Sequence, residues 1–295
     1  MKKTLLATTF LVATAGFAAA EVTVGGSARF GLNADEGASW TDVRMTLNFD
    51  AKMESDSGMT FGGRIRLRSD DGQSYLWASP AMVYMEASGL RVEVGNANGA
   101  YDSAGLIWNS EIGLVDSSFG DPNNDYMGYF ASKSTYDDGA MGVFASYSAG
   151  SFTARGSYHV GDQRDNGDGI IYAESSVSFD YSANGLSLSL AMVQGTDNWA
   201  TDETTFIGAA YAIGDSTNVG INYFTGDAPD LITLYANHSL GNGVTIAGYV
   251  ADQDFYDTAF GIGGSYDLGG GAAVKASYHD RGSESWTDFG VSFSF

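Results

Sequence analysis

The sequence is short of several residue types, and each shortage excludes a class of protein. It contains no cysteine, which excludes a disulfide-stapled secreted domain and a thiolate metal or redox centre. It has 14 Lys and Arg residues against 36 Asp and Glu residues, and this formal net charge of −22 argues against nucleic-acid binding. After the N-terminus, no stretch reaches the roughly 18 apolar residues of a transmembrane helix.

One class of membrane protein survives these exclusions. A transmembrane β-barrel alternates apolar and polar residues along each strand, so its mean hydropathy stays near zero, and here it is −0.10. From residue 21 onward the dominant period is two. Residues 43–53, 59–68 and 289–295 each place apolar side chains on one face and polar side chains on the other. The aromatic share of 13% is too high for an acidic disordered chain.

The N-terminus has the three parts of a secretory signal peptide. Lys2 and Lys3 are basic, the residues from Leu5 to Ala15 are mostly apolar, and Ala18-Ala19-Ala20 offers a cleavage site. We therefore expect residues 1–20 to be a signal peptide and residues 21–295 to form the barrel.

The alternating runs predict a 16-stranded antiparallel transmembrane β-barrel. Seven connections are tight and rich in Gly and Asn, whereas the other eight are longer or more polar. An outer-membrane barrel has short periplasmic turns and longer external loops, so an even strand number places both termini in the periplasm. The predicted strands are 22–33, 41–54, 58–69, 74–87, 89–96, 141–149, 151–160, 170–182, 185–195, 203–213, 216–225, 230–240, 243–251, 257–268, 271–280 and 285–295. Pro80 should cost the strand 74–87 a ladder hydrogen bond.

The connection at about 97–140 is far longer than the others. It combines many acidic residues with an apolar stretch around Leu106 and Ile112, which a solvated flap would not need. We expect this loop to fold inward, pack on the wall and constrict the pore. Its acidic residues are Asp102, Glu111, Asp116, Asp121, Asp125, Asp137 and Asp138.

The cations gather elsewhere in the chain. Seven of them lie within residues 21–91, and strand parity turns all seven toward the lumen. The predicted basic wall consists of Arg29, Arg44, Arg64, Arg66 and Arg68. Glu111, Asp116 and Asp102 of the inward loop would face this wall, and the resulting transverse field would orient dipolar solutes in a narrow pore.

Short stretches along the whole chain after residue 20 resemble the sixteen-stranded general-diffusion porins of Gram-negative outer membranes, of the alphaproteobacterial type. These stretches are EVTVGGSAR (21–29), DSGMTFG (56–62), VGNANGA (94–100), YSAG (147–150), YDLGGG (266–271) and FGVSFSF (289–295). The resemblance implies a homotrimer in outer-membrane lipid and lipopolysaccharide, passive diffusion of small hydrophilic solutes and ions, and a third external loop inside the lumen. It also implies a basic cluster at Arg29, Arg44, Arg66 and Arg68 opposite Glu111 and Asp116.

Three alternatives remain open from the sequence. The five arginines also suit an anion- or phosphate-selective pore. A hydrolase barrel would need a Ser, a His and an acid in contact, but we expect the lumenal His159 and His279 to be solvated instead. An adhesin would need longer external loops. We expect no cofactor, although some relatives bind calcium through loop carboxylates, for which Asp121 and Asp125 are the candidates.

Overall fold

The computed structural model describes residues 20–72, 75–115, 120–126, 141–160, 173–195 and 203–295. In these ranges the secondary structure is all β. No helix in them is long and apolar enough to span a membrane. The signal peptide expected at residues 1–20 lies outside the described part of the chain, apart from Ala20.

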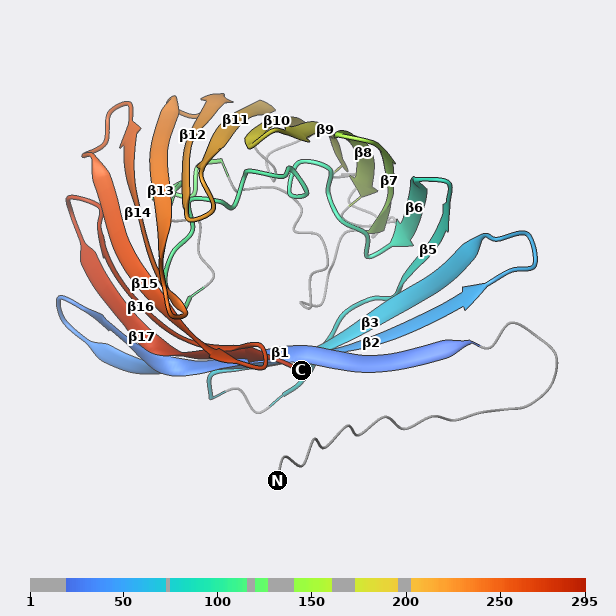
Figure 1. Ribbon diagram of the computed structural model, residues 1–295, viewed down its shortest axis with the longest axis horizontal. Coiled ribbons are helices and arrows are strands. Elements are labelled where there is room, and N and C mark those ends of the chain that lie inside the picture. The colour runs from blue at the N-terminus through green and yellow to red at the C-terminus, as the bar shows by residue number, and fades with distance from the viewer. Residues whose placement is uncertain (1–19, 73–74, 116–119, 127–140, 161–172, 196–202) are drawn as a thin grey trace, which may run out of the picture.

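The strands form one antiparallel sheet that closes on itself (Figure 1). Because β1 pairs with both β2 and β17, the sheet has no free edge. The strands are β1 (Glu21–Asp35), β2 (Ser39–Glu54), β3 (Thr60–Asp70), β4 (Trp77–Ala78), β5 (Met82–Ala87), β6 (Leu90–Gly95), β7 (Met141–Ala149), β8 (Phe152–Val160), β9 (Ala173–Ala183), β10 (Leu186–Gly195), β11 (Glu203–Ile213), β12 (Thr217–Gly226), β13 (Leu231–Gly241), β14 (Val244–Gln253), β15 (Ala259–Gly269), β16 (Ala272–Asp280) and β17 (Ser285–Ser294).

Two of these segments, β4 and β5, share one position in the wall. Both pair with β3, and Pro80 lies between them. Two residues of β3 face three residues at 79–81, which makes a β-bulge. Ser79 satisfies both backbone groups of Arg66 at this bulge. Its Oγ accepts the Arg66 N–H at 2.9 Å, and its own N–H donates to the Arg66 carbonyl at 2.8 Å. The wall therefore has the predicted sixteen strands, with the interruption at Pro80 that the sequence indicated.

The seven predicted tight turns all adopt hairpin geometry at one end of the barrel. Each contains at least one residue with positive φ, such as Asn184 at 52° and Gly185 at 80°. The two ends of the sheet meet at the same rim, where the backbones of Gly26 and Phe295 exchange hydrogen bonds of 2.8 and 3.1 Å. The short turns and the two ends of the described chain thus lie on one side of the wall.

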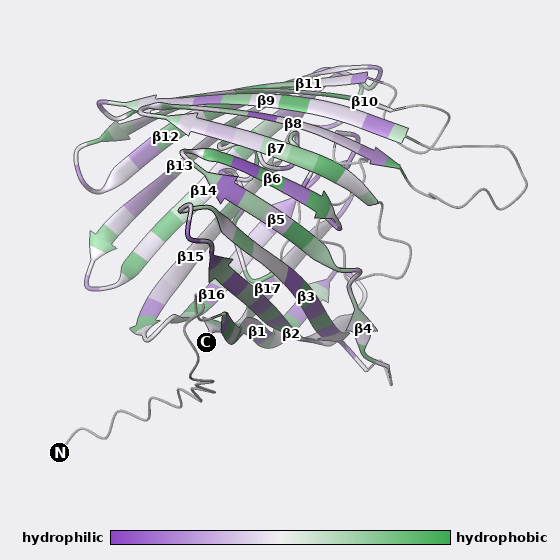
Figure 2. Ribbon diagram, turned by 90° about the vertical axis from the view of Figure 1, so that its right-hand side faces the viewer, coloured by the Kyte–Doolittle hydropathy of each residue, from purple (hydrophilic) through white to green (hydrophobic). Residues whose placement is uncertain are grey.

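The alternation of side chains gives the wall two different faces. On β1, Phe30 and Leu32 are more than half exposed, whereas Arg29 and Asn33, which flank them, are buried. Figure 2 shows this alternation as hydrophobic and hydrophilic bands along the strands. The exposed apolar face is the one that a membrane would cover.

The inner face is less uniformly polar than the sequence analysis predicts. On β11 to β14 the inward residues Phe206, Phe224, Leu231, Tyr235 and Tyr249 are buried in one apolar cluster. The polar inner face is therefore interrupted by apolar residues on this side. The cause is the segment after β6, whose apolar side chains cover these wall residues.

Candidate functional site: a basic wall and an internal loop

The five predicted arginines come together on three neighbouring strands, and we call them the arginine wall. Arg29 on β1 lies directly opposite Arg44 on β2. Arg64, Arg66 and Arg68 alternate along β3, so all three project from its inner face. The five arginines that strand parity turned toward the lumen thus lie together on the inner face of these strands.

Aspartates on the same strands neutralise much of this wall. Arg29 pairs with Asp42 at 2.9 Å, and Arg64 pairs with Asp50 at 2.6 Å. Asp70 accepts from both Arg44 and Arg68 at 2.7 Å. Composition and strand parity predicted the opposing anions on the long loop and did not indicate these three aspartates. The pairs Asp50–Arg64 and Asp70–Arg44 are direct cross-strand neighbours, so the β2–β3 register was the signal that could have found them.

A further cation, Lys275, joins this region through barrel closure. A cavity of about 230 Å³ is lined by Arg29, Arg44, Leu114 and Lys275. Lys275 lies on β16, which is separated from β1 only by β17. The sequence analysis missed it because its position is about 250 residues from Arg29 in the chain.

Residues 96–115 and 120–126, which we call the internal loop, lie inside the ring of strands (Figure 1). Hydrogen bonds hold the loop to the inner face at widely separated strands. Ala100 N–H donates to Ser157 Oγ of β8 at 2.9 Å, Tyr101 N–H to Ser176 Oγ of β9 at 3.1 Å, Asn222 of β12 to the Leu106 carbonyl at 3.2 Å, and Leu114 N–H to Asp288 of β17 at 3.0 Å.

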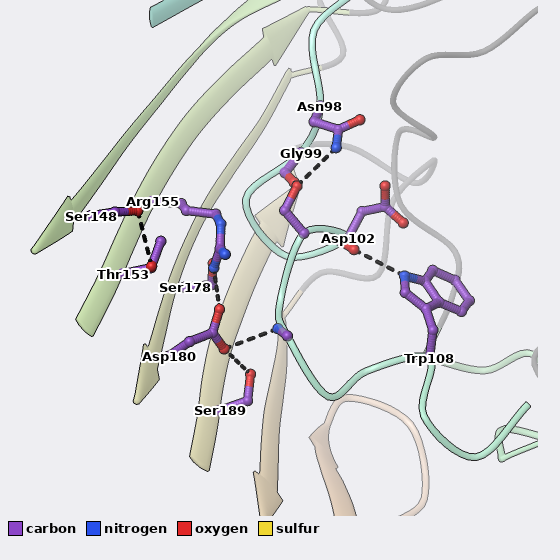
Figure 3. Close-up of polar contacts among 12 residues, drawn as sticks. Asn98, Gly99, Asp102, Trp108, Ser148, Thr153, Arg155, Ser178, Asp180 and Ser189 are labelled. Carbon is purple, nitrogen blue, oxygen red and sulfur yellow. Dashed lines mark hydrogen bonds and ion pairs between the residues drawn. The ribbon is translucent and has the colours of Figure 1, made fainter. Parts of the chain in front are cut away.

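Figure 3 shows a further attachment point of the internal loop, at the Asp180 carboxylate. Asp180 on β9 forms an ion pair with Arg155 on β8. The same carboxylate accepts the Gly105 N–H at 2.9 Å and the Ser189 hydroxyl at 2.6 Å. One aspartate therefore ties the internal loop to three strands.

Apolar packing completes the attachment of the internal loop. Leu106, Ile107 and Ile112 are buried in the cluster that contains Phe206 and Phe224. At the other side of the barrel, Gly31 and Gly290 face each other across β1 and β17. A Cβ atom at either glycine would lie within 2.5 Å of Leu114 Cδ2, so the two glycines form the seat for this side chain. The apolar part of the predicted long loop thus serves to fix it on the wall.

The predicted acidic loop residues occupy different surroundings. Glu111 is half-buried and lines a cavity next to Lys275. Asp102 is half-buried as well, and its carbonyl accepts the Trp108 indole N–H at 2.9 Å (Figure 3). Asp116, Asp137 and Asp138 lie outside the described residues.

Asp121 and Asp125 form a hydrogen-bonded turn. The buried Asp121 carboxylate accepts the N–H groups of Tyr126 at 2.9 Å and Asp125 at 3.3 Å. Asp125 accepts from Gln253 on β14 at 2.8 Å. No group of three or more His, Cys, Asp or Glu residues suited to a metal occurs in the described ranges.

Burial raises the pKa of Asp121 to about 6, and the nearby Asp125 adds to the rise. A carboxyl whose pKa is raised on folding stabilises the structure below its unfolded pKa of 3.8 and loses this contribution as pH passes 6. Asp121→Asn keeps a neutral acceptor at all pH values. We therefore expect slower hydrogen exchange at the Tyr126 amide in Asp121→Asn than in wild type at pH 7.5, and equal exchange at pH 4.5. A difference between the two proteins that persists at pH 4.5 would contradict this assignment.

The two lumenal histidines are buried, so the expectation that they are solvated is wrong. His159 Nε2 donates to the Ala97 carbonyl at 3.2 Å. His279 stacks on Trp286 with ring centroids 4.7 Å apart and contacts Ser277 Oγ at 2.8 Å. The internal loop and the aromatic neighbours cover these rings, which leaves a hydrolase substrate no access to them.

Comparison with known proteins agrees with this architecture. The family model described as Gram-negative porin matches residues 7–284. The chain is 32% identical over 294 residues to a porin of Fuscovulum blasticum, and 26% identical over 310 residues to a porin of Rhodobacter capsulatus; each match covers 93% of this chain and 100% of the relative. A solved Rh. blastica porin variant, with a lysine and an arginine replaced by alanine, matches with TM-score 0.85 at 31% identity, over 93% of this chain and 100% of that one. The chain therefore belongs to the Gram-negative porins, which are passive outer-membrane channels and not enzymes.

Proposed function

We propose that small hydrophilic solutes and ions cross this porin between the arginine wall and the internal loop, and that this opening is the narrowest part of the channel. The observation that carries the proposal is the placement of the two parts. The arginines lie on β1 to β3, whereas the loop is attached to β8, β9 and β12 across the barrel and reaches the edge of the wall only at Leu114, which contacts β1 and β17. A solute in the lumen passes between them.

The charge of the wall implies weak selectivity. The wall contains five arginines, and three aspartates, Asp42, Asp50 and Asp70, form ion pairs with it. The formal charge of the wall with these aspartates is therefore five minus three, or +2. This modest positive charge faces carboxylates of the loop across the opening, so the opening is close to neutral overall and selects weakly between anions and cations. Asp116, Glu111 and Asp102 are the proposed acidic counterpart on the loop.

The orientation in the membrane is part of the same proposal. The short turns and both ends of the described chain share one rim, and outer-membrane barrels keep their short turns in the periplasm. Both termini are then periplasmic, residues 1–20 are a cleaved signal peptide, and the long loop enters from the external side. From the family resemblance we also infer that the protein forms a homotrimer surrounded by outer-membrane lipid and lipopolysaccharide.

An anion- or phosphate-selective pore is the second candidate, and Lys275 is the observation that favours it. With Arg29 and Arg44 it lines one cavity, so three cations from three strands meet there. The aspartates paired with these arginines count against it, because a tight phosphate site would need uncompensated cations.

Single-channel recording in planar bilayers under a KCl gradient tests the proposal. We expect large ohmic steps that occur in threes, with a zero-current potential close to zero. Saturation of the current at low phosphate concentration would favour the second candidate, and absence of conductance would contradict both.

A further inference from the structure

A second cavity lies between the internal loop and the wall that carries it. Its volume is about 250 Å³, and it is enclosed by residues 109–113 on one side and strands β13 to β16 on the other. We call it the loop cleft. Its polar lining is Asn109 and Glu111 from the loop, and Asn237, Thr245, Ser265 and Lys275 from four successive strands.

The loop cleft contains one carboxylate and one ammonium group. Lys275 lines the cleft and interacts electrostatically with the buried Asp288 of β17, but within the described ranges it forms no hydrogen bond or ion pair. Glu111 lies on the internal loop and Lys275 lies on β16, and both segments are held in place by contacts of other residues. Ile112 packs where Gly261 and Gly263 lack side chains, and Leu114 sits in its glycine seat, so Glu111 is held between the wall and two anchored neighbours.

The loop cleft also adjoins the proposed conduction path. Lys275 lines both the loop cleft and the cavity next to Arg29 and Arg44. A solute that leaves the arginine wall therefore meets Lys275 before it reaches Glu111.

We propose that the loop cleft is a low-affinity subsite for small zwitterionic solutes of the amino-acid class, in which Glu111 binds the ammonium group and Lys275 the carboxylate. This inference rests on the proposed function as a channel. Opposite charges in one cleft select against simple ions, since Glu111 repels an anion and Lys275 repels a cation. A zwitterion satisfies both groups, and the amides and hydroxyls of Asn237, Thr245 and Ser265 are suited to a polar side chain.

The binding is expected to be weak. Ion pairs that remain open to water contribute little, so the dissociation constant should be on the order of 10 mM. Weak binding suits a channel, because a tightly held solute would not leave it.

Conductance of the reconstituted full-length channel tests this subsite. Glutamine is added at constant KCl, and the conductance is divided by that of the bulk solution. We expect a saturable decrease for glutamine and only a linear decrease for N-acetylglutaminamide, which lacks both charges. Glu111→Gln and Lys275→Met should each raise the half-saturating glutamine concentration at least threefold, by loss of one ion pair.

Glu54→Gln and Lys52→Met are the matched controls, because they remove the same charges from exposed positions at the end of β2. Both should retain the wild-type half-saturation. Equal, linear decreases for glutamine and the uncharged analogue would overturn the subsite while leaving the channel function intact. A protein without any conductance would instead overturn the proposed function.

Discussion

The double variant Arg66→Ala/Arg68→Ala is expected to shift the zero-current potential toward cation preference. Both side chains project from β3 into the lumen. Their removal takes two positive charges from a wall of formal charge +2 and leaves Asp70 with only Arg44 as its wall partner. Under a tenfold KCl gradient we expect a shift of about 10 mV or more, against an ideal limit of about 59 mV for one monovalent ion.

A control for this prediction removes two cations from elsewhere. Lys52 and Arg91 lie at the rim of the short turns, where Lys52 is exposed and Arg91 stacks over Tyr84 at 3.6 Å. The variant Lys52→Ala/Arg91→Ala has the same net charge as the test variant and should keep a potential close to that of wild type. Equal shifts in the two variants would show that the arginine wall is not at the narrowest point.

The variant Ile107→Asp is expected to release the internal loop from the wall. Ile107 is 2% exposed and belongs to the apolar cluster with Phe206 and Phe224. A carboxylate cannot remain ionised in such surroundings without a large desolvation cost, so at neutral pH the loop should leave its site. The barrel has its own hydrogen-bond ladder and should persist. We expect single-channel conductance to rise about twofold, with increased current noise, as the lumen widens.

Asn124→Asp provides the matched control for the loop variant. Asn124 belongs to the internal loop but is exposed, so the same charge meets water there. Its conductance should stay near the wild-type value. An unchanged conductance in Ile107→Asp, with the barrel shown to be folded by its heat-modifiable migration in gels, would contradict the role of this packing in setting the channel width.

The strands themselves could be predicted because their determinants are local. Alternation sets which face of a strand meets lipid, and residues with positive φ such as Gly58 and Gly150 end one strand and begin the next. The interruption of the strand at Pro80 is equally local, since a proline has no N–H for the ladder. Parity along each strand also placed the five arginines inside the barrel.

The partners of those arginines depended on the register between neighbouring strands, which side-chain alternation alone does not fix. A shift of one residue between β2 and β3 would have separated Asp50 from Arg64 and Asp70 from Arg44. Closure of the barrel then brought Lys275 beside Arg29. The depth of burial of His279 likewise depended on Trp286 from β17 and Tyr249 from β14.

The sequence by itself determined a closed wall with an apolar outside, an inner group of arginines and one long loop with an apolar stretch, because each of these follows from period, turn residues and composition. The tertiary structure decided which side of the wall the loop covers, through the seat at Gly31 and Gly290 and the bond to Asp180. It also decided how far the arginines are neutralised. The position of the loop depends on contacts between residues far apart in the chain, for which a single sequence carries no spacing signal, whereas the neutralisation depends on the register between adjacent strands, which alternation alone does not fix.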